Sequence, residues 1–391
     1  MLKFSWHAIC LVLGRTTATR RFETPEDAMQ APRDLRPLTA LRFFAAMWVV
    51  LYHYWPNLSG GHLPALVAKG YLGVELFFVL SGFILCHVYL DAFADGRFRY
   101  GGFLWARLAR VYPLHLASLI AIGAMAAAAV GLGLVVDPNI LSWPALPANL
   151  LLTQAWGLAG VAGWNHPSWS VSAEWFAYLS FPGFAWLALK FRDRPWVAIG
   201  AAIGLILAAY AVFQAMAGFS LTQATIAWGA LRIVPCFAYG CAINLAWRSG
   251  VVQRRRLGGA GALFSGAMLI FLALASAPDA ALVVTFGGLI ISLGSLSEKV
   301  DRIVGGRTWV YLGEISYAVY MVCIPWKLLY VNLLCRILPL DKAHLPISYW
   351  IIFILMLIPV AALAHHMIER PARILMRRWA ETPAGMRTSV A

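Results

Sequence analysis

Charged residues and cysteines are scarce in this chain. Asp, Glu, Lys and Arg make up 12% of its 391 residues, whereas 61% are hydrophobic. A soluble domain of this length could not stay in solution with that composition, so a soluble globular protein is excluded. The six cysteines have no metal-ligand spacing and most fall in apolar runs, so we expect neither a metal centre nor a disulfide framework. The sequence also lacks an internal repeat and a nucleotide-binding glycine pattern, which excludes repeat arrays and the common nucleotide-binding loops.

Long apolar stretches are what the sequence has instead. Each is about 20 residues long, the length at which a helix crosses the hydrocarbon core of a bilayer. We predict an all-α polytopic integral membrane protein with about ten transmembrane helices, at 38–55, 70–91, 111–136, 169–189, 195–217, 223–247, 258–277, 280–297, 308–330 and 347–368.

The two ends of the chain differ from this apolar centre. We assign residues 1–35 to an N-terminal cytoplasmic extension that is disordered or interfacial, 36–374 to the transmembrane domain, and 375–391 to a short basic cytoplasmic tail. The first 28 residues are either an interfacial anchor or a stretch upstream of a true start at Met29.

The positive charges predict how the chain lies in the membrane. With ten spans and a cytoplasmic N-terminus, all but six of the 31 Lys and Arg fall on the cytoplasmic side; the exceptions are Lys69, Arg336 and Lys342 in outer loops and Arg42, Arg232 and Lys327 within spans. This bias places both termini in the cytoplasm. The net charge of +14 then reflects membrane orientation and anionic lipid headgroups, and nucleic-acid binding explains it poorly because the charges are scattered over many loops.

Two ionisable residues on the first span are candidates for function. Arg42 and His53 are eleven residues apart, close to three helical turns, so they share one helix face at opposite depths, roughly 16 Å apart. An ionisable side chain in a bilayer is costly and usually marks function. The simpler interpretation is that Arg42 reaches out to the cytoplasmic surface while His53 is a satisfied core histidine.

Two carboxylates are predicted at the depth of His53. Glu75, in GYLGVELFFVLSGFIL, could orient an imidazole and raise its basicity, or be a hydrogen-bonded structural acid near the headgroups. Glu174, in WNHPSWSVSAEWFAYLSFP, is flanked by tryptophans, as in many sites that hold sugars. An aromatic belt would explain those tryptophans but not the carboxylate.

A third group is basic. Arg107 and Arg110, in RFRYGGFLWARLARVYP, are three residues apart and so share a helix face just before the third span. Arginine pairs at a membrane surface bind phosphates bidentately, although ordinary positive-inside charge would also account for them. The groups together predict a polarised site, with phosphate-binding arginines at the cytoplasmic end and a base with acids toward the outer end.

Several blocks of the sequence resemble the acyltransferase-3 family of integral membrane acyltransferases. They occur in the family's order over residues 36 to 374 and read RPLTALRFFAAMWVVLYHYWP, GYLGVELFFVLSGFILCHVY, FLWARLARVYPLHL, HPSWSVSAEWFAYLSFP, YLGEISYAVYMVCIPW and IERPAR. The family's paired arginine and histidine fall on Arg42 and His53, its basic loop motif on Arg107 and Arg110, and its WSxxxE block on Glu174. Where many members carry a second histidine, this chain has Cys323.

The resemblance implies an enzyme of the cytoplasmic (inner) membrane of bacteria. Similar proteins O-acylate surface polysaccharides, O-antigen, exopolysaccharide, Nod factors or macrolides, with an acyl-coenzyme A from the cytoplasm as donor. We therefore expect acyl-CoA, with acetyl as the acyl group, as co-substrate, no permanently bound cofactor, and a glycan, lipid-linked sugar or small hydroxylated acceptor.

In the mechanism that we expect, the coenzyme phosphates bind at Arg42, Arg107 and Arg110. His53 is the general base that takes a proton from the acceptor hydroxyl, and Glu75 or Glu174 orients the histidine or the acceptor. A transporter or flippase for an anionic or lipid-linked substrate is the alternative, since Arg232 and Lys327 are also buried. The missing repeated halves and matched broken helices speak against transport, and a sensor or scaffold without activity explains the base and arginines less well.

Overall fold

The computed structural model describes residues 35–134, 136–137, 139–254 and 256–381. The two interpretations of residues 1–28 and the end of the basic tail lie outside these ranges. All regular elements in the described ranges are helices, and six helices are long and apolar enough to cross a membrane: Gly70–Ala94, Tyr100–Gly131, Pro195–Ala217, Gly229–Arg248, Ser316–Ile337 and Ile347–Trp379. These helices indicate an integral membrane protein.

Each of the ten predicted ranges falls on one helix or on a pair of adjacent helices. The longer elements are α1 (Arg36–Tyr54), α4 (Gly73–Ala94), α5 (Tyr100–Gly131), α7 (Trp169–Leu179), α8 (Phe181–Lys190), α9 (Pro195–Ala217), α10 (Gly229–Arg248), α12 (Gly258–Leu274), α13 (Asp279–Leu293), α14 (Glu298–Val304), α15 (Arg307–Glu314), α16 (Ser316–Ile337), α17 (Ile347–Ala364) and α18 (Arg370–Glu381). Short helices in the connections are α2 (Pro56–Ser59), α3 (Ala65–Ala68), α6 (Leu146–Leu150) and α11 (Val251–Arg254).

Three of the differences between the predicted ranges and the observed helices concern where a helix is divided or begins. The range 169–189 is divided at Ser180, because Pro182 lies in the first turn of α8, where its missing N–H costs no hydrogen bond. The range 308–330 is divided at Ile315, where the Ser316 hydroxyl donates to the Gly313 carbonyl at 2.7 Å. The third predicted span, 111–136, belongs to α5, which already begins at Tyr100. The paired arginines of the basic motif therefore lie within this helix and not before it.

The tightest helix pair in the bundle is α4 with α10, and two glycines permit it. A Cβ on Gly82 would lie 2.2 Å from the Phe237 carbonyl oxygen, and one on Gly240 would lie 2.0 Å from the Val79 carbonyl oxygen. Only hydrogen fits at such distances, so the two backbones cross in direct contact, as small residues allow in membrane helices.

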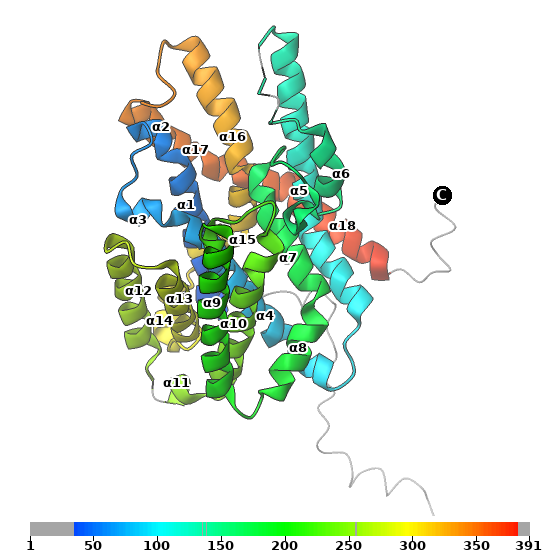
Figure 1. The fold of residues 1–391 in the computed structure, drawn as a ribbon, viewed down its shortest axis with the longest axis vertical. Helices are drawn as coiled ribbons and strands as arrows, with labels where there is room; N and C mark the ends of the chain where they lie inside the picture. Colours follow the sequence, from blue (N-terminus) through cyan, green and yellow to red (C-terminus); the bar gives the residue numbers. More distant parts are fainter. Residues whose placement is uncertain (1–34, 135, 138, 255, 382–391) are drawn as a thin grey trace, which may run out of the picture.

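The helix α1 is central to the arrangement. It packs against α4, α15 and α16, while α5 lies against α7, α16 and α18. Figure 1 shows α12 and α13 at one edge of the bundle and α5 at the other, with α17 and α18 running obliquely across it as one nearly continuous rod. The five residues between α17 and α18, His365–Glu369, form a turn of π-helix that directs Glu369 into the protein, where it is fully buried.

Candidate active site

A small cavity of about 60 Å³ lies where α1, α4, α7 and α16 meet. Its lining combines aromatic rings with a few polar groups, the composition typical of sites for small organic ligands. The lining residues are Arg42, Val74, Phe77, Phe78, Ser170, Val171, Glu174, Tyr317 and Tyr320. Two of the residues predicted from the sequence, Arg42 and Glu174, therefore face the same cavity. The prediction that Glu174 lies at the depth of His53 is wrong, since His53 does not line this cavity.

Arg42 and Glu174 interact electrostatically across this cavity, but they do not form a direct ion pair. Their charges interact, and the Arg42 charge also interacts with those of Arg110 and Glu369. Glu174 accepts a hydrogen bond of 2.8 Å from the hydroxyl of Ser81, one turn beyond the cavity-lining part of α4. The arrangement leaves a cation and a carboxylate oxygen exposed to whatever occupies the cavity.

The other predicted carboxylate, Glu75, has a different partner from the one expected. It is fully buried and forms an ion pair with Arg232 of α10 through the guanidinium Nε. Arg232 also donates from Nη1 to the Ala224 carbonyl at 2.8 Å and lies over the Trp169 ring, 4.6 Å from its centroid. Glu75 thus joins α4 to α10 instead of orienting the His53 imidazole.

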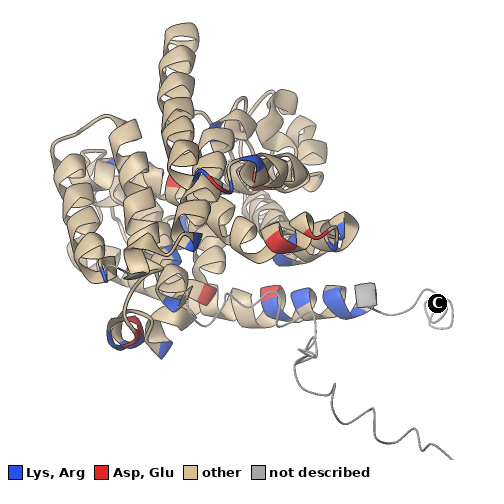
Figure 2. Ribbon diagram, turned by 90° about the horizontal axis from the view of Figure 1, so that it is seen from below, with Lys and Arg blue, Asp and Glu red and all other residues tan. Residues whose placement is uncertain are grey.

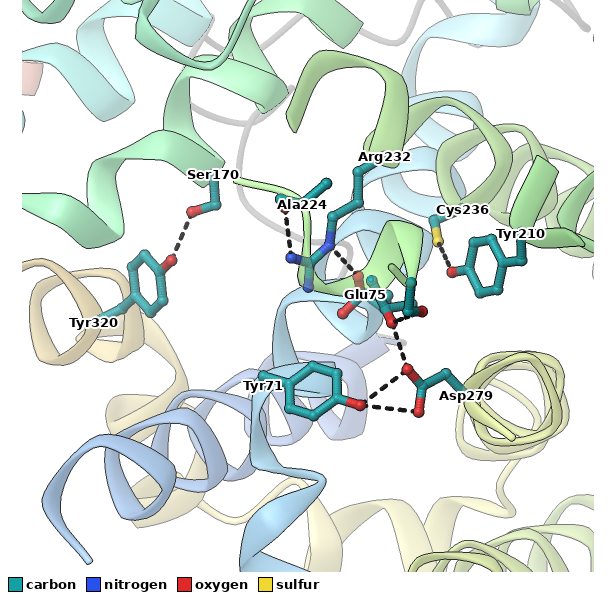
Figure 3. A network of polar contacts seen from close by, with 11 residues as sticks. Tyr71, Glu75, Ser170, Tyr210, Ala224, Arg232, Cys236, Asp279 and Tyr320 are labelled. Atoms are coloured by element: carbon teal, nitrogen blue, oxygen red, sulfur yellow. Dashed lines mark hydrogen bonds and ion pairs between the residues drawn. The ribbon is translucent and has the colours of Figure 1, made fainter. Parts of the chain in front are cut away.

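The surroundings of this ion pair form a second polar network (Figure 3). Asp279, at the start of α13, accepts from the Tyr71 hydroxyl at 3.0 and 2.9 Å and from the Lys69 ammonium at 2.7 Å. Thr222 donates to the same carboxylate, and Tyr210 contacts Cys236 at 3.6 Å. These bonds link the segment before α4 with α13 and with the loop before α10, and they link α9 with α10, so the network holds helices together.

His53 lies near the opposite end of α1 from Arg42, as predicted. The Lys327 ammonium of α16 donates to the His53 carbonyl at 2.7 Å, and Lys327 and His166 lie near enough to interact electrostatically with the His53 ring when they are charged. Burial lowers the pKa of His166 below its ordinary value, so its ring is neutral near pH 7.

A chain of contacts leads from the cavity toward these histidines. The Tyr320 hydroxyl, which lines the cavity, contacts Ser170 Oγ at 2.8 Å and donates to the carbonyl of Pro167 at 2.9 Å. Pro167 follows His166 directly in the chain. Hydrogen bonds therefore lead from the cavity to the loop before α7, whose His166 interacts electrostatically with His53.

The basic pair of α5 lies against the last described helix. Arg107 stacks over the Tyr89 ring at 5.9 Å, and Arg110 Nη1 is 3.9 Å from Glu369 Oε1. Arg373 of α18 lies at the same distance from that oxygen, and Arg377 interacts electrostatically with Arg107, Arg110 and Arg373. Four arginines from two helices thus gather at the Arg42 end of α1.

Sequence reasoning missed several residues of this arrangement. Ser81 and His166 were not among the predicted site residues, although His166 lies in the same motif as Glu174. Arg373 and Arg377 were counted as positive-inside charge; their four-residue spacing, which places them on one helix face like Arg107 and Arg110, was the available signal. Cys323, which replaces a family histidine, is fully buried, and its Sγ donates to the Tyr320 carbonyl at 3.0 Å.

The chain is similar to known proteins, among them an acyltransferase. The model of the family described as "Acyltransferase domain" matches residues 37–366. An acyltransferase of Streptomyces mycarofaciens, MdmB, is 29% identical over 323 residues, which cover 74% of this chain and 79% of that protein. "Protein 2 in picA locus" of Rhizobium radiobacter is 33% identical over 148 residues, 35% of this chain and 75% of that protein. No solved structure matches the chain significantly.

Proposed function

The chain belongs to the acyltransferase domain family, and from that premise we propose that it transfers an acyl group from a cytoplasmic acyl-CoA to a hydroxyl group at the outer side of a bacterial inner membrane. The simplest acyl group is acetyl, and the acceptor is a carbohydrate or a related hydroxylated molecule. The chain crosses the membrane about ten times with both termini in the cytoplasm, because that topology gathers most of its Lys and Arg on one side.

One observation carries the proposal. Arg42 lines the cavity, and its charge interacts with Glu174 on one side and with Arg110 of α5 on the other. A donor with phosphates at one end and a thioester at the other matches this polarity. The phosphates bind Arg107 and Arg110, and the thin pantetheine arm passes Arg42 and enters the cavity.

The chemistry is assigned to His53. Its imidazole takes the proton from the acceptor hydroxyl as the oxygen attacks the thioester carbonyl carbon. The carbon–sulfur bond then breaks, and the departing coenzyme thiolate takes up the proton, which restores the neutral imidazole. General-base assistance of this kind is worth about 10² to 10⁴-fold in rate.

Glu174 is assigned to the acceptor rather than to the histidine. Ser81 holds one of its oxygens at 2.8 Å, and the carboxylate can accept a hydrogen bond from a sugar hydroxyl. Phe77 and Phe78 beside it offer apolar surface to the acceptor or to the acyl chain. Glu75 is left out of the mechanism, because its ion pair with Arg232 occupies it.

The test is acyl transfer by purified protein in detergent, with radiolabelled acetyl-CoA and release of free coenzyme A as readouts. We expect His53→Ala to lose about 10² to 10⁴-fold in turnover. The matched control is His62→Ala, since His62 is an exposed histidine of the outer connection and its variant should keep full turnover. Undiminished turnover in folded His53→Ala protein would refute the assigned base.

A further inference from the structure

The helix α18 is fixed against α5 so that its basic side chains meet those of α5. The Trp105 Nε1–H of α5 donates to the Met376 carbonyl at 2.7 Å, and the rings of Trp105 and Trp379 lie 5.3 Å apart. Figure 2 shows Lys and Arg gathered along α18, the helix that leads toward the C-terminus. Contact with α5 and the four-residue spacing turn Arg373 and Arg377 toward the protein, where both are half-buried, whereas Arg378 is exposed.

These guanidinium groups are not neutralised by the acid between them. Glu369 is fully buried, and its Oε1 is 3.9 Å from both Arg110 Nη1 and Arg373 Nη1, which is too far for a hydrogen bond. Its Oε2 is engaged by His365 Nδ1 at 2.9 Å. Two carboxylates, Glu369 and the more distant Glu314, therefore interact with a cluster of four arginines. Glu369 lies between Arg110 and Arg373 without using their N–H donors.

Two N–H donors in this cluster are directed at no acceptor among the described residues. The Nε–H groups of Arg107 and Arg377 are buried and have no hydrogen-bond partner among the described residues. Stacking over Tyr89 engages the face of the Arg107 guanidinium but not its N–H groups. Buried donors on charged groups are normally satisfied, and a tetrahedral oxyanion would supply several acceptors to a fork of arginines at once.

We propose that Arg373 and Arg377 of α18 complete, with Arg107 and Arg110 of α5, a single binding site for phosphate groups, so that α18 forms one wall of the donor site. Identifying the phosphates as those of coenzyme A rests on the proposed function. Glu369, held by the π-turn before α18, sets the spacing of Arg110 and Arg373 and is a positioning residue.

The experiment measures coenzyme A binding by isothermal titration calorimetry, with the full chain purified in detergent. We expect Arg373→Ala and Arg377→Ala each to weaken binding by about tenfold, as for a lost charge-assisted contact. Arg377→Lys should recover part of the loss, because it keeps the charge but not the planar fork. The exposed neighbour gives the matched control, Arg378→Ala, which should bind like wild type. Thermal unfolding of every variant, followed by tryptophan fluorescence, selects the folded ones for comparison.

Two further ligands separate the sources of phosphate. Adenosine 3′,5′-bisphosphate should compete with coenzyme A in wild type and much less in Arg377→Ala, whereas phosphate-free pantetheine should not distinguish the two proteins. The inference would be overturned if wild type, Arg373→Ala and Arg377→Ala bound coenzyme A with equal affinity. The proposed function would still stand in that case if acyl transfer depended on His53. Arginine-dependent binding of phosphatidylglycerol in nanodiscs, without binding of coenzyme A, would also overturn it and assign the arginines to a lipid headgroup.

Discussion

The protein contains two buried combinations of an arginine with a glutamate, and they are built differently. Glu75 and Arg232 are in direct contact, with side chains 0% and 2% exposed. Arg42 and Glu174 are joined only by their longer-range charge interaction, across a cavity that both of them line. The sequence presented all four as costly intramembrane charges, with nothing to tell one combination from the other.

The difference lies in what remains for a ligand. Arg232 uses its Nε, its Nη1 and the face of its guanidinium group on Glu75, Ala224 and Trp169, and only its Nη2 has no hydrogen-bond partner among the described residues. In contrast, the Glu174 carboxylate is held by the hydroxyls of Ser81 and Tyr178 and, among the described residues, has no cation in direct contact. We infer that the closed pair stabilises the helix packing and that the open pair belongs to the site.

The largest effect is expected from breaking the closed pair on one side. Arg232→Leu leaves the Glu75 carboxylate buried without its partner, which typically costs about 3–5 kcal/mol of stability. The double variant Glu75→Leu/Arg232→Leu removes both charges and should recover most of the loss. Thermal unfolding in detergent measures both, and a double variant no more stable than Arg232→Leu would contradict a purely structural pair.

An intermediate effect, on activity alone, is expected at the open pair. Glu174→Gln keeps the shape of the side chain but removes its charge, and we expect about 100-fold slower acyl transfer, which corresponds to about 2.7 kcal/mol. The unfolding temperature should change little, because Glu174 closes no ion pair. A Glu174→Gln protein with normal turnover and reduced stability would mean that the two combinations have the same role.

A smaller effect is expected where the closed pair's two helices cross. Gly240→Ala places a methyl group against the Val79 carbonyl and should destabilise by about 1–3 kcal/mol through overpacking. Its control is Gly204→Ala in α9, where a Cβ meets nothing within 4 Å, and which should be neutral or slightly stabilising. Unfolding curves in the same detergent compare the two, and equal stability would refute the close α4–α10 contact.

The sequence predicted the helices well because apolar run length is a local property. It also predicted that Arg42 and Glu174 both belong to the site, but it placed Glu174 at the depth of His53, whereas Glu174 lines the same cavity as Arg42. It could not predict the partner of Glu75, because Arg232 lies 157 residues away and the contact depends on how α4 and α10 cross. The same limit hid α18, whose arginines look like ordinary positive-inside charge until the helix packs on α5.

The partners found for the other buried cations weaken the transporter alternative. Arg232 is held by Glu75, and the Lys327 ammonium donates to the His53 carbonyl. Neither Arg232 nor Lys327 lines the cavity that Arg42 faces. An anion path through the protein would need such charges to face a common passage.

The central claim is that one donor molecule spans from the arginines of α5 and α18 to the cavity between Arg42 and Glu174. A cryo-electron microscopy structure of the chain with bound coenzyme A tests it most directly. The account predicts phosphate density between Arg107, Arg110 and Arg377, with the pantetheine arm passing Arg42 and the thiol directed toward His53. Coenzyme A bound elsewhere, with this cavity empty and the arginines unoccupied, would contradict it.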